Sequence, residues 1–576
     1  MEMTGNKRPI LLFLLALAVL PWAGCTHFGP AAAQEKRPDG TGGDTSYYHY
    51  SVGVLQNLAG DTDGAIRSLE NAYSLDPRSA SLAGDLSSLY LKKGNVSGAI
   101  EILEKSLIVY PDDVDNRLLL AGLFLRGKEY DRAIEEYEHV IRLDPGKENA
   151  YLYLSLLYRE RGEYEKASGT LKRLLALNPD HLAGNYALAR LFREMKLERQ
   201  SEAHYRKTLE IDPGYEPALM DLAGLHESSG KYEEATEEYR RILEEDPGRI
   251  DARFRLGRML FEQNLYDEAI AEFLTVLEQN PGNRQTRLAL GMSYFFQGKR
   301  LDLAEPIFLD LLQENPSEET ARYFLAATFE KQGKPDRAME HFSKVTPASG
   351  LYVNSRIHMA VLLKDGGRFD EAVSLLGKTL ESKQEAPLYG ALASLYEENG
   401  NMEKAEETLL QGLGRAPGNI EMRYRLGVLY EKMGQFEKGL QEMQKILDAD
   451  PDHVEALNFV GYGLADRGLR LEEAERMVKK ALQLKPGNGY ITDSMGWVYF
   501  RMNDLPRAAR YLEEAHRMLP EDPTIAEHLG DVYLKMGRKK DTLRLYREAL
   551  ERNPDSAELK KKIKGLLSAP KKTPSR

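Results

Sequence analysis

The single cysteine of this 576-residue chain, Cys25, is the residue whose chemistry is most evident. A thiol is a nucleophile that can accept an acyl or alkyl group, and without a second cysteine it forms no internal disulfide. Two basic residues, the apolar run ILLFLLALAVL at 10–20 and the small pair Ala23 and Gly24 precede it. This order is typical of a secretory signal. The run is too short to span a membrane, which takes about 20 residues, so we expect cleavage.

Small residues directly before a cysteine resemble the lipobox of bacterial lipoproteins, where a peptidase cuts before a cysteine that carries diacylglycerol. Trp22 stands where that motif usually has leucine. The resemblance implies a signal peptide at 1–24, lipid on Cys25 and a flexible linker over 25–46. Thr26, in place of aspartate, implies the outer membrane, facing the periplasm. The alternatives are an ordinary secretory signal with an incidental thiol, or an uncleaved anchor.

Catalytic and metal-binding motifs are absent from the sequence. The eleven histidines are scattered, and no HExxH, paired CxxC or GxxxxGK pattern occurs. The net charge of −12 argues against binding to nucleic acid, which depends on basic surface. We therefore predict no catalytic residue, no metal, no cofactor and no nucleic-acid partner.

Arginines and aromatic residues recur three or four positions apart in the middle of the chain, which places them on one face of a helix. Arginine can bind a carboxylate through two hydrogen bonds, and aromatic rings provide rigid contact area. This spacing predicts a surface for an extended acidic or aromatic peptide; the alternative is that the rings pack between neighbouring helices. The residues are Tyr186, Arg190, Arg193, Phe254, Arg258, Phe261, Phe295 and Tyr323.

A second aromatic cluster lies in YITDSMGWVYF, residues 490–500. We expect Trp497 to face a groove beside Tyr462, Tyr490, Asp493 and Phe500, where an exposed tryptophan would be a binding hot spot. An aromatic ring beside a carboxylate would also suit a glycan. The competing interpretation is a buried tryptophan that joins the thirteenth to the fourteenth of the repeats described next.

The elements that must position these residues repeat along the chain. Three segments align: YDRAIEEYEHVIRLDPG at 130–146, YEEATEEYRRILEEDPG at 232–248 and YDEAIAEFLTVLEQNPG at 266–282. Prolines mark a constant period at positions 77, 111, 145, 179, 213, 247 and 281. Continued to residue 554, the period gives fifteen repeats. The pattern resembles the tetratricopeptide repeat family, a helix-turn-helix unit of about 34 residues, over about residues 47–556.

That resemblance implies an all-α, right-handed superhelical solenoid with a concave groove that binds partner proteins. Small residues such as Gly257 on the first helix and Ala269 on the second let each helix pair approach closely. Positions three before, one after and four after the small residue of the first helix should face the groove.

The period predicts the division of the chain. From Ala338 to Pro347 is nine residues instead of twelve, so we expect a bend that separates repeats 1–9 at 47–346 from repeats 10–15 at 347–555. Residues 556–576 read as an amphipathic capping helix and a basic tail.

The sequence thus predicts a non-enzymatic, lipid-anchored scaffold of the bacterial envelope that binds proteins. Similar lipoproteins imply a setting in assembly or export machinery, such as that for pili, outer-membrane proteins or polysaccharide. The alternative function is a lipoprotein that holds exported polysaccharide in the groove.

Overall fold

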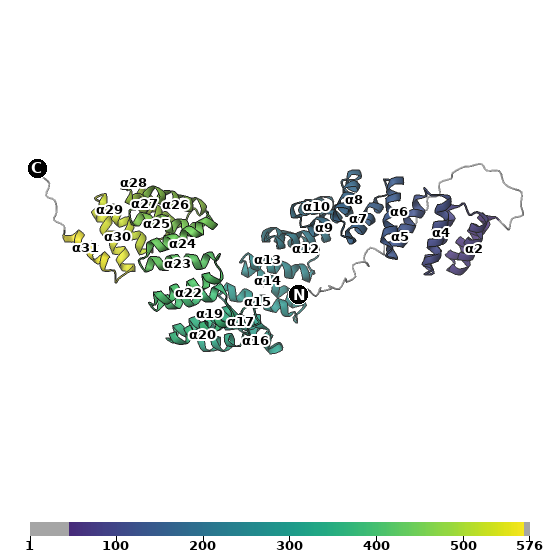
Figure 1. Ribbon diagram of the computed structural model, residues 1–576. Coiled ribbons are helices and arrows are strands. Elements are labelled where there is room, and N and C mark those ends of the chain that lie inside the picture. Colours follow the sequence, from purple (N-terminus) through teal and green to yellow (C-terminus); the bar gives the residue numbers. More distant parts are fainter. Residues whose placement is uncertain (1–44, 569–576) are drawn as a thin grey trace. The chain divides into compact units, whose positions relative to one another are not determined.

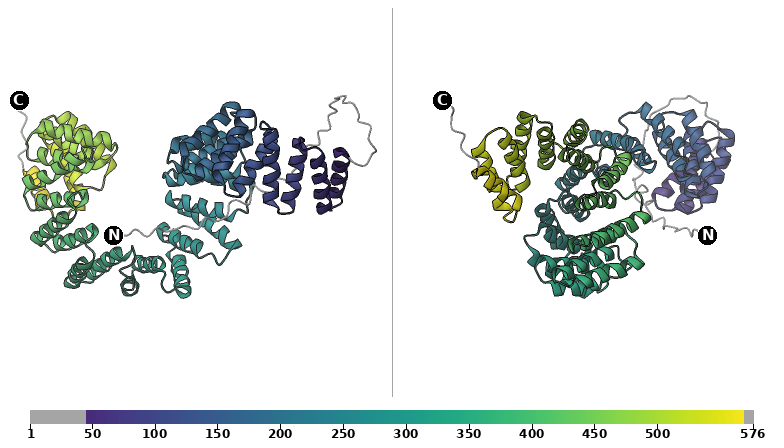
Figure 2. Two further views of the ribbon diagram at one scale, coloured as in Figure 1. Left: turned by 45° about the vertical axis from the view of Figure 1, so that its right-hand side comes forward. Right: turned by 60° about the vertical axis from the view of Figure 1, so that its left-hand side comes forward.

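The computed structural model describes residues 45–568, so Cys25, the signal and the basic tail lie outside the described residues. Every regular element in this range is an α-helix, and the chain divides into two compact units at residues 225 and 226, inside α11 (Glu216–Ser228) (Figures 1 and 2). The first unit contains α1 (Ser46–Leu58), α2 (Thr62–Leu75), α3 (Ala80–Lys92), α4 (Val96–Val109), α5 (Val114–Arg126), α6 (Tyr130–Leu143), α7 (Glu148–Glu160), α8 (Tyr164–Leu177), α9 (Leu182–Glu194) and α10 (Glu198–Ile211).

The second unit contains the remaining helices. They are α12 (Tyr232–Glu245), α13 (Ile250–Glu262), α14 (Tyr266–Gln279), α15 (Arg284–Gln297), α16 (Leu301–Glu314), α17 (Glu319–Lys331), α18 (Pro335–Ser343), α19 (Tyr352–Asp365), α20 (Phe369–Ser382), α21 (Ala386–Glu398), α22 (Met402–Arg415), α23 (Ile420–Lys432), α24 (Phe436–Ala449), α25 (Val454–Asp466), α26 (Leu471–Leu484), α27 (Gly489–Arg501), α28 (Leu505–Met518), α29 (Pro523–Lys535), α30 (Lys539–Arg552) and α31 (Ala557–Ser568).

Within each unit, helices that follow one another in sequence pack side by side, an odd-numbered helix with the even-numbered helix after it. In the described residues fourteen such pairs are found; α11 contains the boundary between the units, and α31 is a final single helix. The predicted all-α repeat fold is confirmed.

Small residues allow the close crossing of each pair, as predicted. A Cβ atom added to Gly257 on α13 would lie 2.7 Å from the ring of Phe273 on α14, so no larger residue fits at this crossing. On the second helices, Ala65, Ala99 and Ala133 have no exposed surface. In the first unit, the core is one cluster of apolar side chains that runs from α2 to α9, whereas the core of the second unit consists of several clusters.

The turn inside each pair requires a left-handed residue. Gly94 has φ 79°, which suits a residue without a Cβ atom. Where glycine is missing, Lys128, Lys196 and Asn503 adopt the same conformation at φ 62°, 59° and 62°. The repeat geometry therefore overrides local preference at these turns, at a modest cost in strain.

The irregular spacing before Pro347 corresponds to a shortened helix. α18 has nine residues, against 13 or 14 in its neighbours α17 and α19. The buried Arg356 side chain of α19 donates to the carbonyls of Phe342, Ser343 and Val345 at 3.3, 3.1 and 3.0 Å, so it satisfies groups that the missing turn would have bonded. The predicted bend and division at this point remain predictions.

Candidate functional site

The predicted arginine and aromatic surface begins in the first unit around one carboxylate. Asp221 of α11 accepts from the Tyr186 hydroxyl at 2.9 Å and lies 3.2 Å from Arg193 and 3.8 Å from Arg190 of α9. Burial and the charge of Asp221 both raise the pKa of Tyr186, which stays protonated. Both arginine side chains are exposed, but each already forms an ion pair with Asp221 of the next repeat.

The same arrangement occurs in the second unit. Arg258 of α13 lies 3.3 Å from Glu227, which also pairs with Arg255 at 3.1 Å. Phe254 packs against the core ring of Phe273, with ring centroids 5.8 Å apart. Arginine and phenylalanine here join adjacent helices, and their outer edges remain accessible.

Further along, the aromatic residues pack between neighbouring helices. Phe295 is buried and stacks edge-on to Phe324 of the next pair, with centroids 5.3 Å apart. Tyr323 shares a hydrogen bond of 3.1 Å with His358 of α19. Phe296, 42% exposed, touches Phe261 and was not foreseen. In this stretch the alternative interpretation, packing between helices, describes Phe295 and Tyr323 better than an open binding surface.

The tryptophan cluster is interior. Trp497 of α27 is 8% exposed, and its indole nitrogen donates to Asp466 of α25 at 3.1 Å. Its ring stacks on His528 of α29 at 4.1 Å and on Phe500 at 4.8 Å. Trp497 therefore connects three successive repeats.

The expected exposed hot spot at Trp497 is thus wrong, and a buried, structural tryptophan is found instead. Asp493, which was expected beside it, is also buried and pairs with His528 at 3.0 Å. Tyr462 is half-buried, and Tyr490 alone of the cluster is well exposed, at 58%. The geometry that suggested glycan binding, a flat exposed ring beside a free carboxylate, is absent at this position.

The surroundings of His528 favour its protonated form. Burial opposes the protonated imidazole, but the charge and hydrogen bond of Asp493, with help from Asp531 and Glu527, outweigh it and raise the pKa of His528. Lys562 of α31 in turn binds Asp531 at 2.8 Å and Glu527 at 2.7 Å. Paired charges and a stacked ring fix this end of the second unit.

An open hollow of about 490 Å³ lies on the first helices of repeats 10, 11 and 12, which are α19, α21 and α23. Its lining includes apolar side chains, of which Val361 is 38% exposed. Lys364 pairs with Glu398 at 2.9 Å on the rim, and Arg425 donates to Ser394 at 3.2 Å and to Glu421 at 2.8 Å. The lining residues are Ile357, Ala360, Val361, Lys364, Leu376, Ala386, Pro387, Gly390, Ala391, Ser394, Leu395, Glu398, Asn419, Glu421, Met422 and Arg425.

Sequence reasoning missed this hollow although its own rule predicts it. Counted from the small residue Ala360, the groove positions are Ile357, Val361 and Lys364, and all three line the hollow. Counted from Ala393, they include Gly390 and Ser394, which also line it. The predicted groove residues are mostly arginines and aromatic residues, whereas a cavity forms where groove positions carry small residues.

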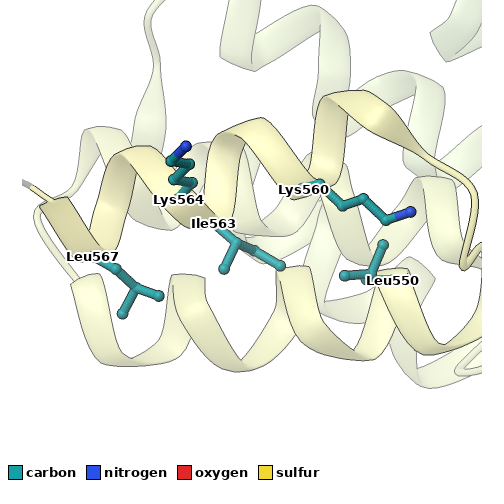
Figure 3. A pocket seen from close by; sticks show the side chains of 5 residues that line it. All are labelled: Leu550, Lys560, Ile563, Lys564 and Leu567. Carbon is teal, nitrogen blue, oxygen red and sulfur yellow. The ribbon is translucent and has the colours of Figure 1, made fainter.

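At the end of the second unit, α31 forms a shallow apolar depression against α30. Leu550, Ile563 and Leu567 line it, with Lys560 and Lys564 beside them (Figure 3). Over residues 45–568, no group of three or more histidine, cysteine or acidic side chains is placed to hold a metal. No helix in that range is long and apolar enough to cross a membrane.

Stacked helix pairs with open surface and a hollow on their first helices define the protein as an α-helical repeat solenoid. Tetratricopeptide repeat sequence profiles match residues 58–123, 124–191, 227–291 and 398–460 in one form and 288–351, 359–420 and 494–557 in another. The chain belongs to the tetratricopeptide repeat family. Proteins of this family bind protein partners, and their repeats generally serve as scaffolds rather than catalysts.

A TPR repeat-containing protein of Pseudomonas aeruginosa is 32% identical over 181 residues, or 31% of this chain and 30% of that protein. This match thus spans under a third of the relative's length. A solved tetratricopeptide repeat protein from Parabacteroides merdae is 21% identical over 43% of this chain and 98% of its own, with a TM-score of 0.33. A chain of the APC/C hetero-tetramer Cut9-Hcn1 is 14% identical over 91% and 96%, with a TM-score of 0.36.

Proposed function

We propose that this protein is a lipid-anchored scaffold of the bacterial envelope that holds a partner protein in the hollow of repeats 10–12. The hollow is the single observation that carries the proposal, because its volume of about 490 Å³ lies within the range of ligand-binding sites and most of its lining comes from first helices, which form the binding face of repeat solenoids of this kind. The setting we propose is assembly or export machinery, as the lipoprotein resemblance implies.

The chemistry of the hollow favours a peptide segment as the ligand. Its floor, which includes Ile357, Leu395 and Met422, accepts an apolar side chain. On its rim, Lys364 and Arg425 are paired with acidic neighbours, so both signs of charge are available to fix an extended backbone and its side chains. We expect an apolar anchor residue between polar flanks.

The arginines of the predicted surface contribute less in this proposal. Arg190, Arg193 and Arg258 already contact Asp221 or Glu227, so an acidic partner would have to displace an internal carboxylate. The exchange of one ion pair for another gives little net affinity. We assign these arginines to a secondary role at the edge of a bound partner.

Photo-crosslinking tests the hollow. A photoreactive residue in place of Glu398, an exposed residue on the rim of the hollow, is activated in intact envelopes and should give adducts with a small set of envelope proteins. The same residue at the exposed position Gly414 on α22 is the matched control, and equal adducts from both positions would contradict the proposal.

Lipid attachment at Cys25 has its own test, because that residue lies outside the described range. Cells grown with a labelled fatty acid should label the wild-type protein and not a Cys25→Ala variant. Label that persists in the variant would disprove the anchor and leave the hollow untouched.

A further inference from the structure

The first helix of the described chain, α1, exposes an apolar face that no described residue covers. Tyr47 and Leu58 are 80% and 79% exposed, Leu55 is 65%, Tyr48 is 46% and Val54 is 37%. At 100° per residue these five side chains fall within a sector of about 120°. Gly53, which is buried against α2, points in the opposite direction. The helix therefore has two apolar faces, and only one is packed.

No repeat precedes α1 in the described residues, and this explains part of the face. Tyr48 and Leu55 correspond to Leu82 and Leu89 on α3, one repeat later, and both of those leucines are buried. Any first repeat leaves these two positions bare. They would not by themselves indicate a ligand.

The other three positions are not explained in this way. In the next two repeats, the residues equivalent to Tyr47, Val54 and Leu58 are polar or small, and all except the half-buried Gly122 are exposed. The equivalents are Ser81, Ser88 and Lys92 on α3, and Asp115, Gly122 and Arg126 on α5. Repeat 1 thus extends its apolar face beyond what repeat stacking requires.

Charge separates α1 from the other helices. Of the 31 helices in the described residues, it alone contains no Asp, Glu, Lys or Arg. The depression on α31, by contrast, has Lys560 and Lys564 beside its leucines (Figure 3). Three tyrosines near the start of α1 and aliphatic residues towards its end suit the boundary between lipid headgroups and acyl chains.

We infer that the exposed face of α1 rests on the surface of a lipid bilayer. The inference deepens the proposed function, since it rests on the anchor at Cys25, which comes shortly before Ser46 in the sequence. As a random coil, a segment of that length has an average end-to-end distance of roughly 25 Å, so of the described helices α1 begins nearest to the anchor. A second copy of the chain is the weaker occupant, because one helix face is smaller than the ~800 Å² per partner that a stable interface buries.

Lipid photo-crosslinking tests the inference on the full chain. The protein is bound to phosphatidylcholine vesicles that contain a photoactivatable phospholipid, and adducts are located by mass spectrometry. We expect adducts within residues 47–58 and none on the equivalent residues 81–92. Because α1 has no lysine or arginine, the yield should change less than about twofold when anionic phosphatidylglycerol is added.

A variant that gives repeat 1 the residues of repeat 2, Tyr47→Ser with Val54→Ser and Leu58→Lys, should keep native helicity and lose about tenfold or more of the adduct yield. The matched control replaces three exposed aliphatic residues elsewhere in the first unit, Ile108→Ser with Leu143→Ser and Leu177→Lys, and should keep the full yield.

The outcomes separate this inference from the anchor. A lipidated Cys25 without adducts on 47–58 would overturn the inference and leave the anchor standing. Adducts on residues 47–58 with an unmodified Cys25 would overturn the anchor and leave the contact between α1 and the bilayer standing. Crosslinks from α1 to a second copy of the chain would overturn the inference and show that the exposed face of α1 is a dimer interface.

Discussion

Two neighbouring stretches of the second unit present the same helix positions and use them in opposite ways. On α21, the positions three before and one after the small crossing residue are Gly390 and Ser394, and they line an open hollow. On α27, the same positions are Asp493 and Trp497, and they fill the space and join neighbouring repeats. Side-chain size therefore decides whether a groove position binds a partner or stabilises the stack.

The stretch in which large side chains fill the groove positions, around α27, gives the largest expected effect on stability. Trp497→Ala removes a buried ring that contacts α25 and α29, so we expect local stability to fall by about 3–5 kcal/mol. Hydrogen exchange of α27 and α29 measures this, because solenoids unfold locally. Tyr490→Ala on the same helix removes a side chain that is 58% exposed and should change little; a similar loss in both variants would break the comparison.

If the open stretch is filled, partner binding should be lost. Gly390→Leu with Ser394→Leu places bulk in the hollow, where a Cβ atom on Gly390 meets nothing closer than 3.9 Å. We expect affinity for a captured partner to fall by about 2 kcal/mol or more, roughly 30-fold, with the fold intact. Calorimetry on the purified partner measures it, and Gly414→Leu is the control for the gain in helix propensity that Gly390→Leu brings.

We expect local stability around α27 and α29 to depend on pH. Because Asp493 raises the pKa of His528 above its ordinary value, the pair stabilises fully below about pH 6.5 and loses this contribution as pH rises through the folded pKa. Relative to a His528→Gln variant, the wild type should lose about 1.4 kcal/mol for each unit by which the pKa is raised. Hydrogen exchange of α29 at several pH values measures this, and a constant difference would contradict the assignment.

The smallest effect should come from the first unit. Arg193 and Asp221 are partly exposed, so a double-mutant cycle with Arg193→Ala and Asp221→Ala should give a coupling of only about 0.2–1 kcal/mol. A coupling well above this range would make the arginines structural clamps comparable to Trp497.

The fold could be predicted from the sequence because the same pattern of small, aromatic and proline residues recurs in fifteen repeats. Gly257 and Ala269 mark a close helix crossing, and each later copy removes the ambiguity that one copy would leave. The turn residues Lys128 and Lys196, by contrast, are not of a type that favours the left-handed conformation, and only their place in the period identifies them.

The site was harder to predict, for two physical reasons. Trp497 follows a small residue like any groove position, but its burial depends on His528, a partner that belongs to the next repeat. The hollow is defined by absent bulk at Gly390 and Ser394, which no chemical motif reports. A search for small residues at groove positions would have found it.

The central claim, that repeats 10–12 bind a partner and repeats 13–15 do not, has one direct test. Photoreactive residues in place of Glu398, on the rim of the hollow, and of Tyr490 are compared in the same envelopes, since both positions are exposed and lie on first helices of the second unit. The account predicts protein adducts from position 398 that Gly390→Leu abolishes, with few from position 490. Adducts from position 490 alone, or adducts from position 398 that survive Gly390→Leu, would contradict it.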